Sequence, residues 1–324
     1  MQTKTITIVG LQRTGTSIAL ALREGPIDFL VIGHDSNRHV LDESAVQAAV
    51  DRIEPDLIKA CQPADIVVLA MPSVELEATL RLLGDKLQAH TLVIDLSELK
   101  APGNEFAGRY LRQGFYVGAR PVFSTATFTD LTDELTEARA DLFKNSVFCI
   151  MAVADTDPQA IDTAVTFGRL LGGTPYFVDP VEYDILAQGV ETMPGLLAGT
   201  LFRAVTKAAG WRDMLRFADL PFAQGTQPLN SDTENLAHLA LHDREATLRW
   251  LDAVAAEVAE LRRWIQEGEE DVLAAFLADL NRNRAKWLKE RSDNAWEEGT
   301  GDGLDVPTMS EHFFGGLARR RKQG

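Results

Sequence analysis

The stretch GLQRTGTS, Gly10 to Ser17, stands between a short apolar run, TITIV, and a helical pattern that continues to about Arg23. An apolar strand that passes through a glycine turn into a helix is typical of the first unit of a Rossmann fold. The turn departs from the pattern Gly-x-Gly-x-x-Gly at one place. Gln12 stands where the second glycine is expected, between Gly10 and Gly15.

An acidic residue follows where the pattern requires one, because Asp35 ends the next predicted strand, DFLVIGHD. With the strand, the helix and the acid in place, the sequence predicts a dinucleotide-binding domain of the Rossmann type. The carboxylate of Asp35 is suited to accept hydrogen bonds from ribose hydroxyls and would repel a 2′-phosphate, which favours NAD over NADP. Asn37 and Arg38 lie just beyond it and leave NADP as an alternative.

The free N–H groups at the start of the helix after Gly15 form the expected pyrophosphate site. Gln12 has to turn its side chain away, or the cofactor has to sit slightly displaced, and Arg13 is placed to meet a phosphate oxygen. Alternatively, Gln12 and Arg13 form an ordinary surface turn on a site that no longer binds. The residues predicted to contact the cofactor are Gly10, Gln12, Arg13, Thr14, Gly15 and Asp35, with Ala70, Met71 and Pro72 from the end of a later strand.

Strand and helix patterns alternate through residues 1–180, which predicts an α/β fold with a doubly wound parallel sheet. The pattern over 181–291 is helical and predicts an all-α second domain, and a polar, glycine-rich tail occupies 292–324. Apolar residues from Leu248 to Ile265 recur every three or four positions and form one stripe. Such a stripe belongs either to a long core helix or to a subunit interface, and the second possibility predicts a homodimer through the helical domain.

Composition narrows the classes of partner. The chain has 324 residues, with 32 basic and 48 acidic side chains and a net charge of −16, which repels nucleic acid and anionic membranes. No apolar run approaches the roughly 18 residues that a membrane helix needs. Cys61 and Cys149 lie far apart in apolar stretches, so we expect no disulfide, no metal site and a cytoplasmic location. A small anionic substrate is compatible with a locally basic pocket.

The order of several stretches resembles the prephenate/arogenate dehydrogenase family over about residues 4–290. These stretches are IVGLQRTGTSIALAL, VIGHD, ADIVVLAMP, VIDLSELK, VGARPVF, ADLFKNSVFCI, GGTPYFVDPVEYD and HDREATLRWLD. The resemblance implies a Rossmann domain, a helical dimerisation domain and an NAD(P)-dependent oxidative decarboxylation of tyrosine biosynthesis. In that reaction a hydride leaves the ring carbon that bears a hydroxyl, a base takes the hydroxyl proton, and CO₂ departs.

The chain departs from the family at the catalytic positions that the resemblance implies. The family's histidine lies in Gly-x-His-Pro, where this chain reads GARP with Arg120. The serine that hydrogen-bonds this histidine lies in Asp-x-x-Ser-x-Lys, where DLSELK has Glu98. Because a hydrogen-bonded couple is exchanged for a charged one, we predict an ion pair between Glu98 and Arg120. Arginine cannot act as a base near neutral pH, so the pair either holds an anionic group or fills a vacated site.

The helical domain departs from the family as well. A stretch like Ser-His-Leu-Pro-His is replaced by ETMPG, which begins at Glu191 and makes Thr192 the third catalytic candidate. An arginine-bearing segment is replaced by PFAQGTQPL, with Ala223 and Gln227 at the arginine positions. Glu191 is an alternative base if it is partly desolvated, and Tyr183 is a candidate hydrogen-bond donor near the domain junction.

Two functions are consistent with this pattern. The first is an NAD(P)-dependent oxidoreductase of the prephenate/arogenate dehydrogenase type that is altered in substrate or activity. The second is a catalytically inactive sensor or regulatory homologue that keeps the dinucleotide fold.

Overall fold

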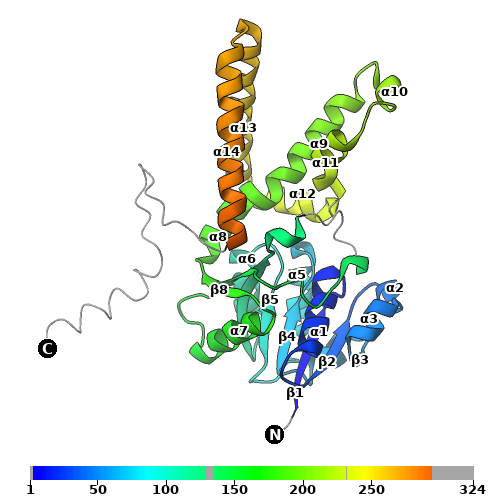
Figure 1. The fold of residues 1–324 in the computed structure, drawn as a ribbon. Helices are drawn as coiled ribbons and strands as arrows, with labels where there is room; N and C mark the ends of the chain where they lie inside the picture. The colour runs from blue at the N-terminus through cyan, green and yellow to red at the C-terminus, as the bar shows by residue number, and fades with distance from the viewer. Residues whose placement is uncertain (1–2, 129–134, 231, 294–324) are drawn as a thin grey trace, which may run out of the picture.

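The computed structural model describes residues 3–128, 135–230 and 232–293 (Figure 1). Its first part is an eight-stranded sheet in the order β3-β2-β1-β4-β5-β6-β7-β8. The strands are β1 (Lys4–Val9), β2 (Phe29–His34), β3 (Arg52–Ile53), β4 (Ile66–Leu69), β5 (Leu92–Asp95), β6 (Phe115–Val122), β7 (Val147–Met151) and β8 (Thr174–Phe177). The predicted Rossmann-type sheet is confirmed.

One pair of strands differs from the all-parallel sheet that the sequence predicts. Strands β6 and β7 are antiparallel, whereas every other neighbouring pair is parallel. A parallel neighbour needs a crossover connection, usually a helix. The described part of the β6–β7 connection contains only the short 3₁₀ turns Thr125–Thr127 and Leu135–Glu137.

Helices cover both faces of the sheet, as a doubly wound fold requires. They are α1 (Arg13–Glu24), α2 (Arg38–Leu41), α3 (Ser44–Ala49), α4 (Leu57–Cys61), α5 (Ser73–Leu83), α6 (Ala101–Tyr110) and α7 (Pro158–Leu170). Apolar residues of α1, α3 and α7 share one core, and those of α4, α5 and α6 share the other. The run SAVQAAVDRI has helical spacing throughout, but the helix ends at Ala49, and Arg52–Ile53 form the edge strand β3.

The second part of the chain is helical and lies beyond the carboxyl ends of β1, β4 and β5 (Figure 1). Its elements are α8 (Pro180–Ala187), a π-helix (Gln188–Thr192), α9 (Met193–Thr206), α10 (Trp211–Met214), α11 (Leu220–Thr226), a 3₁₀ turn (Gln227–Asn230), α12 (Thr233–His242), α13 (Arg244–Glu267) and α14 (Glu270–Asp293). The division into domains at residue 180 stays a prediction, and residues 294–324 of the predicted tail lie outside the described part.

Two arms project from the helical part, one made of α13 and α14 and the other of α9 to α11 (Figure 1). Gly268 adopts a left-handed conformation, with φ of 70°, and allows the turn between α13 and α14. The apolar stripe on α13 contains no fully buried residue. Leu248, Val258 and Ile265 are 57%, 57% and 66% exposed, and Leu251, Val254 and Leu261 are half-buried. Of the two alternatives for this stripe, a long helix buried in the core of the chain is therefore wrong.

No helix among the described residues is both long and apolar enough to cross a membrane. Cys61 and Cys149 are buried and unpaired with each other.

The glycine turn after β1 is a close approach of three backbone segments. Gly10 has φ of 93°, and a Cβ atom there would lie 2.3 Å from the carbonyl oxygen of Ala70. A Cβ on Gly15 would lie 1.8 Å from the carbonyl oxygen of Gly10. Gln12, in contrast, has φ of −68° and an exposed side chain, so its backbone does not require glycine.

We expect Gly15→Ala to lower the free energy of unfolding by about 3 kcal/mol or more, because its Cβ would meet main-chain atoms that cannot move independently. Urea unfolding measures the change. Gly108→Ala is the matched control, since a Cβ at this exposed helical position meets nothing within 4 Å. This control should be neutral or stabilising by about 0.5–1 kcal/mol. Equal effects of the two substitutions would contradict the packing described for the turn.

Candidate functional site

Asp35 ties the glycine turn to the end of β2. One carboxylate oxygen accepts a hydrogen bond from the N–H of Leu11 at 2.8 Å, and the other accepts one from the N–H of Asn37 at 2.8 Å. Each oxygen retains a second acceptor position, so the predicted contact with a ribose stays compatible with this geometry. The structure adds a role that the sequence did not predict, since Asp35 also holds the turn in place.

The start of α1 fits a pyrophosphate group. Gln12 is the N-cap residue and makes no side-chain hydrogen bond to the helix, so no side chain of its own covers the first N–H groups. Thr14 is half-buried beside it. Arg13 is buried, and its guanidinium lies 5.9 Å from the centre of the Phe123 ring. Whether Arg13 contacts a phosphate stays a prediction.

The end of β4, where the sequence predicts contacts with the cofactor, is linked to Glu98 through Ser73. The carbonyl of Ala70 packs on Gly10, Met71 is buried, and Pro72 is the N-cap residue of α5. The next residue, Ser73, donates hydrogen bonds from its N–H and its hydroxyl to Glu98 Oε2, both at 2.9 Å. The N–H groups of Glu98 and Leu99 donate in turn to the Ser73 hydroxyl oxygen. The loop after β5 is thereby fastened to the start of α5.

Arg120 lies between two carboxylates near the end of β6. Its Nη2 atom donates to Glu191 Oε2 at 2.9 Å, and its Nη1 atom donates to the carbonyl of Leu96 at 2.9 Å. Nη1 also lies 3.9 Å from Glu98 Oε1. The predicted ion pair of Glu98 and Arg120 is therefore present, but the carboxylate that hydrogen-bonds Arg120 is Glu191. The sequence had offered Glu191 only as a possible base.

A π-helix positions Glu191. Glu191 Oε1 accepts a hydrogen bond from the Tyr183 hydroxyl at 2.7 Å. The buried Gln188 donates to the carbonyl of Leu239, which anchors the π-helix on α12. A Cβ on Gly189 would lie 2.6 Å from the Trp250 ring, so α13 packs closely against the same turn. Segments of this kind occur often at functional sites.

Glu98, Arg120, Glu191 and Tyr183 form one cluster. The surroundings set the protonation states of three of these side chains. Burial alone would raise the pKa of Glu98, but Arg120 and the Ser73 donors outweigh it and bring this pKa below its ordinary value. Burial alone would lower the pKa of Arg120, but Glu191, Tyr183 and Glu98 raise it above its ordinary value. Burial and Glu191 raise the pKa of Tyr183 well above its usual range. Arg120 and Tyr183 therefore stay protonated at neutral pH, and Glu98 stays ionised.

A fully buried lysine lies behind the cluster. Lys100 Nζ donates to the carbonyls of Asp95 and Ser97 and lies 3.5 Å from Asp95 Oδ2. The same carboxylate oxygen accepts hydrogen bonds from the Ser97 hydroxyl at 3.0 Å and the Tyr116 hydroxyl at 2.7 Å. Buried charges of this kind are tolerated when they are paired and hydrogen-bonded. The network holds the loop that carries Glu98.

Asp184 joins the helical part to the sheet. Its two carboxylate oxygens accept hydrogen bonds from the N–H groups of Lys100 and Ala101, at 2.7 and 2.8 Å. Burial raises the pKa of Asp184 to about 6, against the opposing effect of these two N–H donors. A second link joins α12 to α5, where Val74 donates to Asn235 Oδ1 at 3.4 Å. Asp184 follows Tyr183, so the first link lies directly beside the cluster.

The structure brings together only some of the predicted substrate residues. Thr192 is buried next to Glu191. Ala223 lies on α11 and Gln227 in the turn that follows, and both elements pack on α9. Among the described residues, no group of three or more His, Cys, Asp or Glu side chains could hold a metal ion. Ser73 and Asp184 were not predicted. Ser73 directly follows the stretch ADIVVLAMP and Asp184 ends the stretch GGTPYFVDPVEYD, and these positions are the only signal that could have indicated them.

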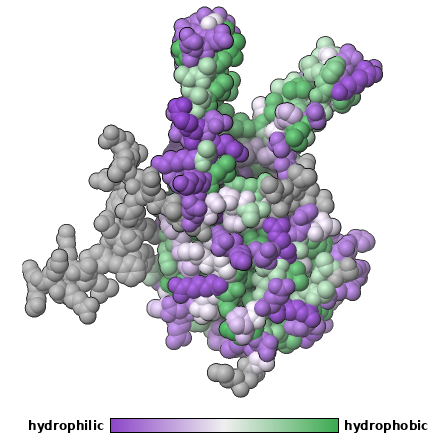
Figure 2. Space-filling model, viewed as in Figure 1, coloured by the Kyte–Doolittle hydropathy of each residue, from purple (hydrophilic) through white to green (hydrophobic). Residues whose placement is uncertain are grey.

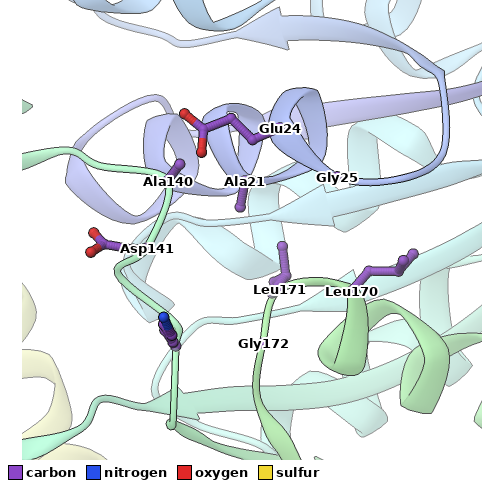
Figure 3. Close-up of a pocket in the computed structure, with 9 residues that line it drawn as sticks. Ala21, Glu24, Gly25, Ala140, Asp141, Leu170, Leu171 and Gly172 are labelled. Carbon is purple, nitrogen blue, oxygen red and sulfur yellow. The ribbon is translucent and has the colours of Figure 1, made fainter.

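A separate open pocket lies between the end of α1 and the turn after α7 (Figure 3). Ala21, Glu24, Gly25, Ala140, Asp141, Lys144, Leu170, Leu171 and Gly172 line it. It involves the end of α1 opposite the glycine turn and contains none of the predicted site residues.

Comparison with known proteins agrees with this architecture. A family model described as the nucleotide-binding domain of prephenate dehydrogenase matches residues 18–176. The Rossmann-type part of the chain therefore matches the nucleotide-binding domain of the prephenate dehydrogenase family. The chain is 24% identical over 287 residues to a prephenate dehydrogenase of Lactococcus lactis, covering 82% of this chain and 76% of that protein. It is 21% identical to a cyclohexadienyl dehydrogenase of Zymomonas mobilis, covering 87% of this chain and 95% of that protein.

A solved structure shares the fold of this chain. It is the prephenate dehydrogenase of Aquifex aeolicus in complex with hydroxyphenyl propionate and NAD⁺, with a TM-score of 0.76 and 17% identity. The alignment covers 88% of this chain and 99% of that one. The family model begins at Ile18 and does not cover the glycine turn from Gly10 to Ser17. The description of this turn therefore rests on the structure of this chain and not on the family match.

We expect stability to depend on pH through Asp184. Its folded pKa lies above its ordinary value, so its contribution is full below the unfolded pKa and is lost as pH rises through about 6. The free energy of unfolding of the wild type relative to Asp184→Asn should therefore fall by on the order of 2 kcal/mol between pH 4 and pH 7. Urea unfolding at each pH measures it. The exposed substitution Asp162→Asn should show no such trend, and a difference that stays flat or rises with pH would contradict the assignment.

Proposed function

We propose that this protein is an NAD-dependent dehydrogenase of the prephenate dehydrogenase type, altered in substrate, that oxidises a small carboxylate. The observation that supports it is a continuous series of contacts from the glycine turn to Arg120. Gly10 touches Ala70, Ser73 holds Glu98, and Glu98 approaches Arg120. A cofactor bound at the turn and a substrate bound at the cluster would thus be neighbours.

The chain's own residues account for the binding of a dinucleotide. The turn from Gly10 to Gly15 and the start of α1 would hold the pyrophosphate. Asp35 would bind the adenosine ribose, and Ala70 to Pro72 would lie at the nicotinamide end of the cofactor. NAD, when bound, supplies a hydride acceptor. The resemblance in sequence places Arg120 at the position of the family's catalytic histidine. Its neighbours raise its pKa above the ordinary value, so it would orient a charged group without accepting a proton.

The surroundings of Asp35 favour NAD over NADP. Glu75, in the first turn of α5, has its pKa raised by burial and by the charges of Asp35, Asp232 and Glu234. These carboxylates are therefore close enough to repel one another. A 2′-phosphate placed near Asp35 would add about two more negative charges to this group.

We expect the protein to bind NADH at least tenfold more tightly than NADPH in a fluorescence titration. Asp35→Asn should narrow this preference, because it removes charge while keeping an acceptor for the Leu11 N–H. Failure to bind either nucleotide, or equal binding of both, would contradict the proposal. NAD reduction is then assayed with prephenate, with arogenate and with other small carboxylates. Turnover would identify the substrate.

We also propose that the protein is a homodimer formed through the helical part. Apolar side chains are exposed among polar ones on both arms (Figure 2). Ile265 is 66% exposed on α13, and Phe217 is 78% exposed beyond α10. Large exposed apolar patches are uncommon on monomers, and where they occur they mark association sites. A cytoplasmic location and a place in tyrosine biosynthesis stay predictions.

We expect Val258→Asp combined with Ile265→Asp to convert the dimer to a monomer, since burying two carboxylates in an apolar interface is costly. Size-exclusion chromatography with light scattering gives the mass. Ala256→Asp is the control, because residue 256 is exposed on the opposite side of α13 from this stripe and should leave the dimer intact. A wild-type mass equal to that of one chain would refute the homodimer.

A further inference from the structure

The last turns of α14 reach the part of the chain that contains the sheet (Figure 1). Arg291 is buried, with 4% of its surface exposed, and its Nη2 atom donates hydrogen bonds to the carbonyls of Val122 and Phe123. One turn earlier, the Trp287 ring stacks on that of Phe128, with ring centres 5.8 Å apart. Two side chains of α14 therefore hold both ends of the short described segment that follows β6.

This segment connects α14 to the glycine turn. The guanidinium of Arg13 lies over the ring of Phe123, 5.9 Å from its centre. The same ring contacts that of the buried Phe143, with ring centres 5.9 Å apart. Arg13 is the first residue of α1, directly after the N-cap residue Gln12. A series of contacts thus runs from α14 through the segment after β6 to the start of α1.

The position of the charge on Arg13 matters for a dinucleotide. The first N–H groups of α1 form the expected pyrophosphate site, where the positive end of the helix dipole attracts an anion. A guanidinium on the first residue of the helix adds a full positive charge at short range. Arginine is a flexible side chain, so an aromatic ring that restricts it lowers the entropy cost of binding. Fixing Phe123 therefore fixes the charge that a dinucleotide meets.

We propose that Arg291 is a positioning residue for the dinucleotide, because it holds the segment after β6 so that Phe123 keeps the guanidinium of Arg13 at the pyrophosphate site. This inference rests on the proposed function, which places a dinucleotide at the glycine turn. The arm of α13 and α14 then has a second task besides association, since its base shapes the cofactor site from the far end of the described chain.

The test compares NADH with adenosine, which lacks the phosphates. Arg291→Met removes the hydrogen-bond donors and keeps an unbranched apolar stem. It should weaken NADH binding at least fivefold in calorimetry and leave the affinity for adenosine, measured by competition with NADH, within twofold of the wild type. Arg291→Lys keeps a donor group and the charge, and it should recover part of the loss. Arg284→Met, at an exposed position on the same helix, is the matched control and should bind both ligands as the wild type does.

A second set of variants tests whether the effect passes through Arg13. Arg13→Gln should itself weaken NADH binding at least fivefold, and in that background Arg291→Met should have less than a twofold further effect. Phe123→Leu keeps an apolar side chain but removes the ring, so it should reproduce the loss that is selective for NADH. If Arg291→Met lowers the melting temperature too far for titration, an unchanged NADH affinity in Phe123→Leu overturns the proposal.

Three results overturn the positioning role and leave the proposed function intact. The first is an unchanged NADH affinity in Arg291→Met. The second is an equal loss of affinity for NADH and adenosine, which a merely structural role would produce. The third is a full fivefold effect of Arg291→Met in the Arg13→Gln background. Absence of NADH binding to the wild-type protein would instead refute the proposed function, and this role with it.

Discussion

The contact between the main chain of Gly10 and the carbonyl of Ala70 is the constraint on which the rest of the site depends. It leaves no room for a side chain, so the end of β1 and the end of β4 lie directly against each other. Asp35 closes the same turn from the side of β2. Three parallel strands thus end in one rigid rim, and α1 begins there with its N–H groups uncovered by its own N-cap side chain.

A second constraint is the connection between the rim and the helical part. Asp184 accepts two main-chain N–H groups at the start of α6, and the neighbouring Tyr183 donates to Glu191. Because these residues are adjacent, the helical part cannot shift against the sheet without moving the partner of Arg120. Structural anchoring and the chemistry of the cluster are therefore coupled through one short segment of α8.

The permanent charge of Arg120 distinguishes this site from one in which a histidine acts as the base. Arg120 carries a permanent charge and is partnered by carboxylates on both sides. Such a group stabilises and orients, but it transfers no proton near neutral pH. A dehydrogenase reaction at this site would therefore need a proton acceptor other than Arg120.

The sequence by itself determined the elements whose signals are local. The strand, glycine turn and helix around Gly10, the acid at Asp35 and the helical change after Pro180 all depend on periodicity and turn chemistry, and the structure contains them. Glu98 and Arg120 were paired from the sequence because the resemblance places them where the family has a serine and a histidine that are hydrogen-bonded to each other. Only the tertiary structure decided that Glu191 is the hydrogen-bonded partner of Arg120, that β7 runs antiparallel, and that the stripe on α13 is not buried in the core of the chain. These features depend on contacts between segments far apart in the chain, and their energies leave no trace in local residue spacing.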